Sequence, residues 1–289
     1  MKRRVCLLLF AIVLLACAPN PERQRVEPKI LRVSVLPDES REKLLERYTP
    51  LVEYLAQELG MPYRLIIPKD YDELLNLFHG QEIDLAYFGG FTFMKAHIAD
   101  QAEPLVMRDV DTRFTSYFLA RAADPGQEIA DFKGRTFAFG SDLSTSGHLM
   151  PRFFLYEMGM VPETFFGAVR YSGKHDLTAY WVRDGEVDLG VANHAVIDQM
   201  YQDGRLHPDE VRILYETPPY PDYVWALQPR FTEAFRIKLR NAFLGLAMTD
   251  ARQAAILAGV DAGAFLPAGM HDFAKLEKVM TGLARPGRK

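Results

Sequence analysis

The chain has 289 residues with a formal net charge of −4 at pH 7, and 48% of its residues are hydrophobic. This mildly acidic balance, without a basic stripe, is no electrostatic match for nucleic acid, so we exclude a nucleic-acid partner. The length and apolar content are enough for the cores of two lobes, although they are small for two independent domains.

The N-terminus has the pattern of a bacterial lipoprotein leader. Positive residues 2–4 precede an apolar run at 5–16, which at about a dozen residues is too short to span a bilayer. The run ends in Leu-Leu-Ala directly before Cys17. We expect a signal peptide at 1–16 and a lipidated Cys17 that anchors the protein on the extracytoplasmic side of the membrane, in the bacterial cell envelope. An ordinary secretory signal with a chance cysteine is the alternative.

The cysteine content supports the anchored interpretation. The chain has two cysteines, Cys6 in the leader and Cys17. Once the leader is removed, the remaining thiol is the one to be acylated, so we expect no intramolecular disulfide, no cysteine metal site and no catalytic thiol. Residues 17–29 comprise this cysteine and a proline-containing polar segment that we interpret as a flexible tether.

Strand-like and helix-like segments then alternate in a first series, which indicates an α/β arrangement. We expect strands at 30–36, 63–67, 83–88, 105–110 and 116–121, and helices at 50–59, 71–78 and 91–98. Thr49 is the predicted cap of the first of these helices, and Pro50 its first-turn proline.

A second series begins near Asp131 and is followed by a helical C-terminal third. We expect strands at 135–139, 168–171, 187–191 and 223–227, and helices at 148–158, 175–183, from 194, and at 231–248, 251–258 and 273–283. Two series with a helical return predict two α/β lobes with mainly parallel sheets, joined by two crossings near 116–121 and 223–227. The expected boundaries are 30–116 plus 228–289 for lobe 1, and 117–227 for lobe 2.

The segment 140–151 contains three consecutive hydroxyl residues, Ser144, Thr145 and Ser146, followed by Gly147. They lie where the end of a strand meets the start of a helix. The first turn of a helix leaves N–H groups unpaired and carries a partial positive charge, so an anion is stabilised there. The hydroxyls add donors, and glycine allows a close approach of the backbone. Helix capping alone is the alternative interpretation.

With the segments described next, this loop resembles the substrate-binding proteins of phosphonate, phosphite and phosphate ABC importers, over about residues 31–257. The resemblance implies a bilobed type II periplasmic binding protein fold, in which two α/β lobes joined by a two-strand hinge close on a ligand. It implies an ABC permease and an ATPase as partners, no cofactor and no metal. In the family a Ser-Thr-Ser-Gly loop holds the phosphorus oxyanion of the ligand, which assigns Ser144, Thr145 and Ser146 to ligand binding. We expect a monomer.

The resemblance adds further ligand contacts at the ends of predicted strands. Tyr71 corresponds to a tyrosine that donates its hydroxyl to the ligand, and His175 lies in a segment similar to the family's histidine-bearing helix. Phe88 and Gly89 end a strand in a similar pattern, but the family often has a tyrosine in place of Phe88, so this chain loses a donor there. The backbone amide of Gly89 can still serve. For Tyr71 and His175, a core aromatic and a capping residue are the respective alternatives.

Asp222 corresponds to an aspartate that contacts ligand in the family. A carboxylate beside an oxyanion is favourable when the ligand carries a proton or an amine, because the carboxylate then accepts a hydrogen bond. Related phosphorus oxyanions keep such a proton near neutrality, since phosphate monoesters have a second pKa near 6, whereas sulfate does not. Members that bind aminoethylphosphonate carry a further acidic residue, and Ala195 stands at that position. We therefore expect phosphate, phosphite or a simple phosphonate.

Two other classes of protein compete with this interpretation. Ser, His and Asp are present as nucleophilic catalysis requires, but the Gly-x-Ser-x-Gly elbow is absent from 140–151, and the remaining histidines show no metal-ligand spacing. We therefore expect no enzyme. A ligand-sensing lipoprotein of the same fold that reports to a signalling partner remains the alternative.

Overall fold

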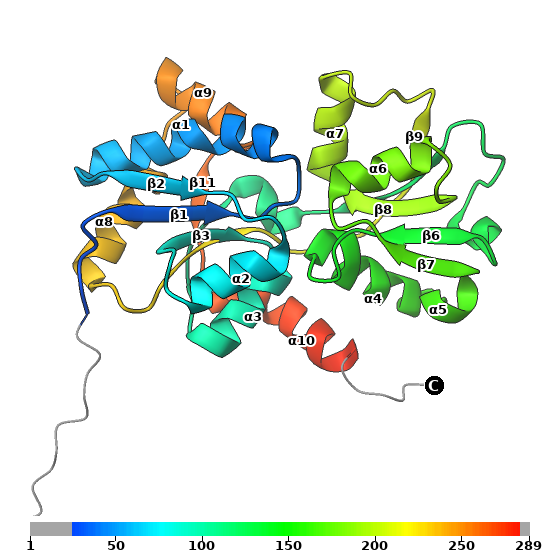
Figure 1. The fold of residues 1–289 in the computed structure, drawn as a ribbon, viewed down its shortest axis with the longest axis horizontal. Coiled ribbons are helices and arrows are strands. Elements are labelled where there is room, and N and C mark those ends of the chain that lie inside the picture. Colours follow the sequence, from blue (N-terminus) through cyan, green and yellow to red (C-terminus); the bar gives the residue numbers. More distant parts are fainter. Residues whose placement is uncertain (1–24, 284–289) are drawn as a thin grey trace, which may run out of the picture.

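The computed structural model describes residues 25–283, which form two α/β lobes (Figure 1). The leader expected at 1–16 and Cys17 lie outside these residues. Across residues 25–283, none of the helices combines the length and the apolar character that spanning a bilayer requires.

The first lobe is built on a six-stranded sheet in the order β11-β4-β10-β3-β1-β2. Its strands are β1 (Leu31–Val35), β2 (Tyr63–Ile66), β3 (Leu85–Phe88), β4 (Glu103–Arg108), β10 (Val224–Leu227) and β11 (Phe265–Pro267). Its helices are α1 (Arg41–Leu59), α2 (Tyr71–His79), α3 (Gly90–Asp100), α8 (Glu233–Leu244), α9 (Ala251–Gly259) and α10 (Ala274–Leu283). Helices α1 and α9 lie on one side of the sheet and α2 and α3 on the other (Figure 1). The apolar side chains of both layers are buried in one continuous core.

The second lobe is built on a five-stranded sheet in the order β7-β6-β8-β5-β9. Its strands are β5 (Ser116–Arg121), β6 (Thr136–Phe139), β7 (Ala168–Tyr171), β8 (Leu189–Asn193) and β9 (Val211–Glu216), and its helices are α4 (Met150–Glu157), α5 (Pro162–Phe165), α6 (His175–Arg183) and α7 (His194–Gln202). Side chains alternate between its two faces, as the pleat of a strand requires. Phe137 and Phe139 join one apolar cluster, whereas Ala138 joins the cluster on the opposite face.

The chain passes between the lobes twice, at 109–115 and 217–223. The two crossing segments pair with each other, because the amide of Phe114 donates to the carbonyl of Tyr220 at 2.8 Å and the amide of Tyr220 donates back at 2.9 Å. A two-stranded connection of this kind allows one lobe to rotate relative to the other.

The predicted start of the first helix was wrong. Helix α1 begins at Arg41, where the Ser40 hydroxyl accepts a hydrogen bond from the amide of Lys43, and Pro50 lies inside the helix. Proline at this position removes one backbone hydrogen bond. The turns before it nevertheless bury Leu44 and Tyr48, and this apolar face favours continuing the helix through the proline.

Three further features differ from the prediction. Both sheets are mixed, because β5 and β10 run antiparallel to their neighbours where the chain enters each lobe. Strands β9 and β11 were not predicted. The helix expected at 148–158 begins earlier, as a π-helical turn at Thr145–Leu149 that continues into α4.

Candidate functional site

Four helical segments begin where the two lobes meet, each shortly after a strand. They are α2 after β2, α3 after β3, the π-helical turn at Thr145–Leu149 after β6, and α6 after β7. Ligands of open α/β sheets bind beyond the carboxyl ends of the strands, and the N-terminus of each helix presents amide donors with a partial positive charge. The backbone therefore favours an anion at this place without needing a lysine or an arginine.

The three hydroxyl residues of the loop after β6 lie in different hydrogen-bonding environments. Ser144 Oγ accepts from the amide of Gly147 at 2.9 Å and so caps the turn. Thr145 Oγ1 accepts from the amide of Phe91, at the start of α3 in the other lobe, also at 2.9 Å. Ser146 Oγ is buried and has no partner. One serine thus shapes the loop, the threonine bonds the opposite lobe, and the second serine keeps its hydroxyl unpaired.

Glycines bring the elements of the site into close contact. A Cβ atom on Gly89 would lie 3.3 Å from Thr145 Oγ1 and 3.4 Å from Asp222 Oδ1, and one on Gly147 would lie 2.9 Å from the His175 ring. A Cβ on Gly90 would lie 2.5 Å from Leu276. The absence of a side chain at Gly89 lets the loop after β6 approach the start of α3, and its absence at Gly147 lets the same loop approach His175.

Four buried side chains at this place each carry one polar atom without a partner. They are Tyr71 Oη, Ser146 Oγ, His175 Nε2 and Asp222 Oδ2. All four side chains are at least 97% buried. Buried polar atoms are almost always hydrogen-bonded, and leaving one unpaired costs about 1–3 kcal/mol. We call these four side chains the ligand cluster, since a bound molecule with polar atoms of its own would satisfy them.

The hydrogen bonds of His175 fix the position of its proton. Its Nδ1 accepts from the backbone amide of Asn193 at 3.2 Å, so Nδ1 carries no hydrogen. Burial lowers the pKa of His175 to about 4, which keeps the ring neutral near pH 7. The neutral ring then carries its proton on Nε2, and the unpartnered nitrogen is a donor without a positive charge.

Asp222 is the acidic member of the ligand cluster, and only one of its two carboxylate oxygens has a partner. Its Oδ1 accepts from the amide of Gly90 at 2.9 Å, and its Oδ2 has no partner. Burial raises the pKa of Asp222 to about 7, although the Gly90 amide and the nearby Thr145 and Ser146 hydroxyls favour the ionised form. Near pH 7 this carboxyl group is therefore present in both protonation states. It can accept a hydrogen bond when it is ionised, or donate one when it is protonated.

Tyr71 completes the set as a hydroxyl donor. Burial raises its pKa well above the ordinary value of 10.0, so the phenol keeps its proton. The ligand cluster thus offers three donors, from Tyr71, Ser146 and His175, and one carboxyl group that shares a proton. This pattern fits a tetrahedral oxyanion that carries no more than one proton.

Phe88 and Ala195, which the sequence also pointed to, lie among apolar side chains. Phe88 packs edge to face against Phe78, with ring centroids 5.2 Å apart, inside the core of the first lobe. Ala195 lies in the first turn of α7 and packs against apolar side chains. Neither side chain brings a polar atom to the ligand cluster.

The sequence analysis missed Asn193, whose amide orients His175. Asn193 ends β8 and caps α7, because its Oδ1 accepts from the amide of Val196 at 3.2 Å. An asparagine between a strand and a helix is the same signal that marked the other candidates, so it was available in the sequence.

The arrangement does not activate a nucleophile. In a serine–histidine site the hydroxyl is hydrogen-bonded to the histidine base, whereas here His175 Nδ1 accepts from an amide and Nε2 has no partner within hydrogen-bond distance. In the described part of the chain, no group of histidine, cysteine and acidic residues is placed to hold a metal ion.

Comparison with known proteins identifies the family. The family model described as "ABC transporter, phosphonate, periplasmic substrate-binding protein" matches residues 33–273. A probable ABC transporter phosphite binding protein, PhnD1 of Prochlorococcus marinus, is 28% identical over 264 residues, covering 87% of this chain and 89% of that protein. The phosphate-import protein PhnD of Mycolicibacterium smegmatis is 26% identical over 250 residues, covering 81% of this chain and 78% of the relative.

A solved structure confirms the expected fold class. The structure of PhnD1 from Prochlorococcus marinus in complex with methylphosphonate matches with a TM-score of 0.83 and 27% identity, covering 89% of this chain and 99% of that one. The prediction of a bilobed periplasmic binding protein fold is therefore correct.

Proposed function

Because this chain belongs to the family of periplasmic substrate-binding proteins of phosphonate ABC transporters, we propose that it captures a singly protonated phosphorus oxyanion between its lobes. Members of this family act outside the cytoplasm, are not enzymes, and work with a permease and an ATPase. The observation that carries the proposal is the ligand cluster, in which four buried side chains from both lobes each have one unpartnered polar atom.

In the proposed complex the tetrahedral group accepts from three donors and shares a proton with the fourth group. Tyr71, Ser146 and His175 donate to phosphoryl oxygens, and the Asp222 carboxylate accepts the hydrogen that the ligand keeps. The Ser144 and Thr145 hydroxyls, which accept from backbone amides, still have their own hydrogens to donate. The amide of Gly89 lies at the start of α3 and adds a backbone donor.

Hydrogen-bond energies make this proposal reasonable. Hydrogen bonds to charged groups contribute roughly 1.5–3 kcal/mol each. Four of them supply about 6–12 kcal/mol before the costs of desolvating the anion and closing the lobes. Binding in the micromolar range, which corresponds to about −8 kcal/mol, is within reach.

The ligand class is narrowed by what the site lacks. Neither Phe88 nor Ala195 presents a polar group, so an amine on the ligand meets no carboxylate at either of these positions. The related proteins named above bind or import phosphite, methylphosphonate and phosphate according to their descriptions. We propose a ligand from the same group: phosphate, phosphite or a simple alkylphosphonate.

Isothermal titration calorimetry at pH 8 against phosphate, phosphite, methylphosphonate, aminoethylphosphonate and sulfate tests the proposal. We expect at least one of the first three to bind in the micromolar range, and sulfate to bind at least tenfold more weakly. No heat from any phosphorus oxyanion would refute the proposed ligand class. Sulfate binding as tight as that of phosphate, whose dianion keeps one proton at pH 8, would refute the role of Asp222.

We also propose that the protein is a monomer held at the membrane by a lipid on Cys17. The sequence pattern at 1–17 supports this anchor. Replacement of Cys17 by serine should release the protein from the membrane fraction while leaving its ligand affinity unchanged. A variant that stays in the membrane fraction would contradict the anchor.

A further inference from the structure

Apart from the ligand cluster, a second set of buried polar groups joins the lobes. Tyr223 Oη donates to Asp38 Oδ2 at 2.6 Å, and Asn193 Nδ2 donates to Tyr223 Oη at 2.8 Å. The backbone N–H of Asn193 donates to His175 Nδ1 at 3.2 Å, and the backbone N–H of His175 donates to the Asp38 carbonyl at 3.1 Å. These four bonds close a ring, which we call the interlobe ring.

Two bonds of the ring pass from one lobe to the other. Asp38 follows β1 in the first lobe, and Tyr223 is the last residue of the second crossing segment, directly before β10 of the same lobe. Asn193 ends β8, and His175 begins α6 in the second lobe. The Asn193–Tyr223 and His175–Asp38 bonds therefore reach from the second lobe across the interface.

The donor and acceptor roles within the ring are consistent with one another. The Asp38 carboxylate only accepts, so the Tyr223 hydroxyl must donate to it and can accept from Asn193. The Asn193 side chain cannot be flipped, because its oxygen already accepts from the amide of Val196. Tyr223 thus uses its hydrogen and a lone pair inside the ring, and it has no hydrogen left for a ligand.

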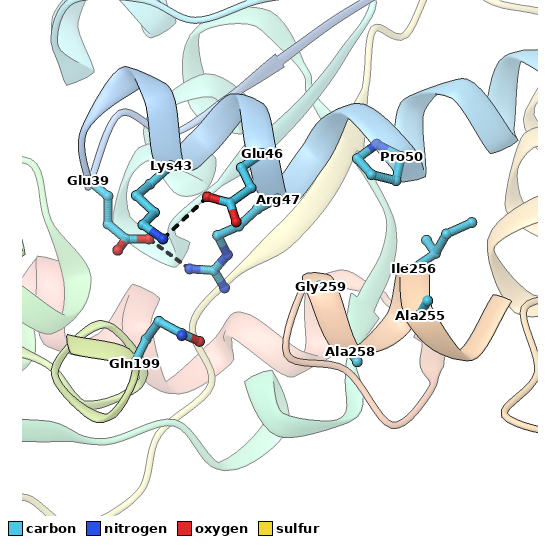
Figure 2. Close-up of a pocket in the computed structure, with 10 residues that line it drawn as sticks. All are labelled: Glu39, Lys43, Glu46, Arg47, Pro50, Gln199, Ala255, Ile256, Ala258 and Gly259. Carbon is cyan, nitrogen blue, oxygen red and sulfur yellow. Dashed lines mark hydrogen bonds and ion pairs between the residues drawn. The ribbon is translucent and has the colours of Figure 1, made fainter. Parts of the chain in front are cut away.

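Ionic contacts lie beside the ring at the outer edge of the interface. The Glu39 carboxylate pairs with Arg47 of its own lobe at 2.7 Å and with Arg205 of the second lobe at 3.5 Å. Lys43 pairs with Asp203 of the second lobe at 3.6 Å. Figure 2 shows Glu39, Lys43 and Arg47 on one side of a cavity of about 290 Å³, with Gln199 of α7 across from them.

We propose that Asp38, Tyr223 and Asn193 are positioning residues that stabilise the closed form and hold His175 in place without contacting the ligand. When the lobes separate, water reaches the Asp38 carboxylate and the Asn193 amide. Loss of the Tyr223 hydroxyl leaves both groups unpaired only in the closed form, because water replaces it in the open form. The ring therefore contributes to closure itself.

The test compares Tyr223→Phe with Tyr54→Phe. Tyr54 is also buried and donates one hydrogen bond, to the carbonyl of Ala242 at 3.2 Å, but it lies within the first lobe. The first readout is the interlobe distance of the ligand-free protein, measured between spin labels at the exposed positions Glu58 and Glu186. We expect Tyr223→Phe to shift the distribution towards separated lobes and Tyr54→Phe to leave it unchanged. Identical distributions in both variants would overturn the proposal.

The second readout is the affinity for methylphosphonate, an arm that rests on the proposed function. Tyr223→Phe should bind about tenfold more weakly, mainly through faster dissociation, and saturating ligand should restore the short distance. The ¹⁵N shifts of His175 should still report a proton on Nε2 in the closed form. If no phosphorus oxyanion binds the parent protein, the proposed ligand class is refuted. The distance measurement still tests the role of the interlobe ring in that case.

A second pair of variants tests the same interface in case Tyr223→Phe does not fold. Arg205→Met removes the interlobe pair with Glu39, and Arg183→Met is its control because Arg183 pairs with Asp184 of its own lobe at 2.8 Å. We expect Arg205→Met to shift the distance distribution towards separated lobes by less than Tyr223→Phe does, and to bind about threefold more weakly. Arg183→Met should change neither quantity. Equal behaviour of the two arginine variants would contradict a role for contacts at this edge.

Discussion

The ligand cluster and the interlobe ring lie at the same interface and are both buried, yet they differ in how their polar atoms are satisfied. Every polar contact of the ring is made by the protein, from Asp38 through Tyr223 and Asn193 to His175. Each member of the cluster has one atom left unpaired. His175 belongs to both sets, with Nδ1 bonded in the ring and Nε2 free.

This difference separates two tasks that a closing binding protein has to perform. Protein-to-protein bonds align the lobes, and their strength does not depend on a ligand. Unpaired buried atoms lower the stability of the closed form by roughly 1–3 kcal/mol each, and a ligand that pairs them recovers that free energy. We therefore expect the cluster to make closure dependent on the ligand and the ring to set how readily closure occurs.

Removing two members of the cluster should have the largest effect. We expect Tyr71→Phe combined with Ser146→Ala to weaken binding of the best phosphorus oxyanion by about 10²–10⁴-fold, since each hydrogen bond to a charged group contributes roughly 1.5–3 kcal/mol. Thermal stability should stay the same or rise, because both lost hydroxyls are unpaired in the ligand-free protein. Calorimetry and thermal unfolding measure the two effects.

The matched control replaces a tyrosine and a serine whose hydroxyls are already bonded. Tyr54 donates to the Ala242 carbonyl at 3.2 Å, and Ser34 donates to the Ile66 carbonyl at 2.8 Å. Tyr54→Phe combined with Ser34→Ala should lower stability and leave the affinity unchanged. If both double variants lose stability without losing affinity, the cluster is not a ligand site.

Asp222→Asn should stabilise the ligand-free protein at alkaline pH. The pKa of Asp222 is about 7 in the folded protein and 3.8 ordinarily, so the folded state binds more protons between about pH 4 and 7. The free energy of unfolding therefore falls as the pH rises through this window, by up to about 4 kcal/mol. Asparagine does not titrate, so the variant should lack this fall and gain up to about 4 kcal/mol at pH 8.

Urea unfolding of the parent protein and the variant at pH 4.5 and pH 8 measures this difference. The stability gain should be large at pH 8 and small at pH 4.5, where the parent carboxyl is already protonated. An equal difference at both values would show that Asp222 is not buried as a shared-proton group.

The affinity for phosphite or an alkylphosphonate, whose last ionisable proton is lost near neutrality, should peak near pH 6–7. The proposed complex holds one proton between Asp222 and the ligand. Above about pH 7 neither free partner carries it, so affinity should fall about tenfold per pH unit as a proton is taken up. Below about pH 6 both partners carry one, and a proton must be released. His175, with a pKa of about 4, does not titrate in this range.

Sulfate provides the contrast, because it brings no proton of its own near neutrality. It can bind only when Asp222 is protonated, so its affinity should fall above pH 7 and level off below. Calorimetry from pH 5 to 9, in buffers of different ionisation enthalpy, counts the protons taken up or released. A flat profile for phosphite or methylphosphonate would contradict the shared proton.

Much of the site's location was readable from the sequence because it depends on local transitions from strand to helix. The positions of Tyr71, Gly89, Ser144 and His175 follow from where an apolar run ends and a capping residue begins. Strand β11 was missed because it is three residues long and ends in a proline. Strand β9 was missed because only one of its residues is fully buried.

What the sequence could not give is the direction in which neighbouring side chains point and which distant residues meet. Ser144, Thr145 and Ser146 are equivalent by pattern, but the fold gives the first two hydroxyls different partners and leaves the third without one. The proton position of His175 depends on an amide 18 residues away, and the Tyr223–Asp38 bond joins residues 185 apart. Long-range contacts of this kind are set by packing of the lobes and leave no local signal.

Thr145 offers the finest distinction between the two tasks, since it lies in the loop of the cluster but bonds the opposite lobe. Thr145→Val keeps the shape of the side chain and loses the acceptor for the Phe91 amide, whereas Thr145→Ser keeps the hydroxyl. We expect about tenfold weaker binding for the valine variant and less than a threefold change for the serine variant. Dissociation rates from stopped-flow measurements should account for most of the loss, because the broken bond stabilises closure. An equal loss in both variants would show that the methyl group, and not the hydroxyl, is what the opposite lobe requires.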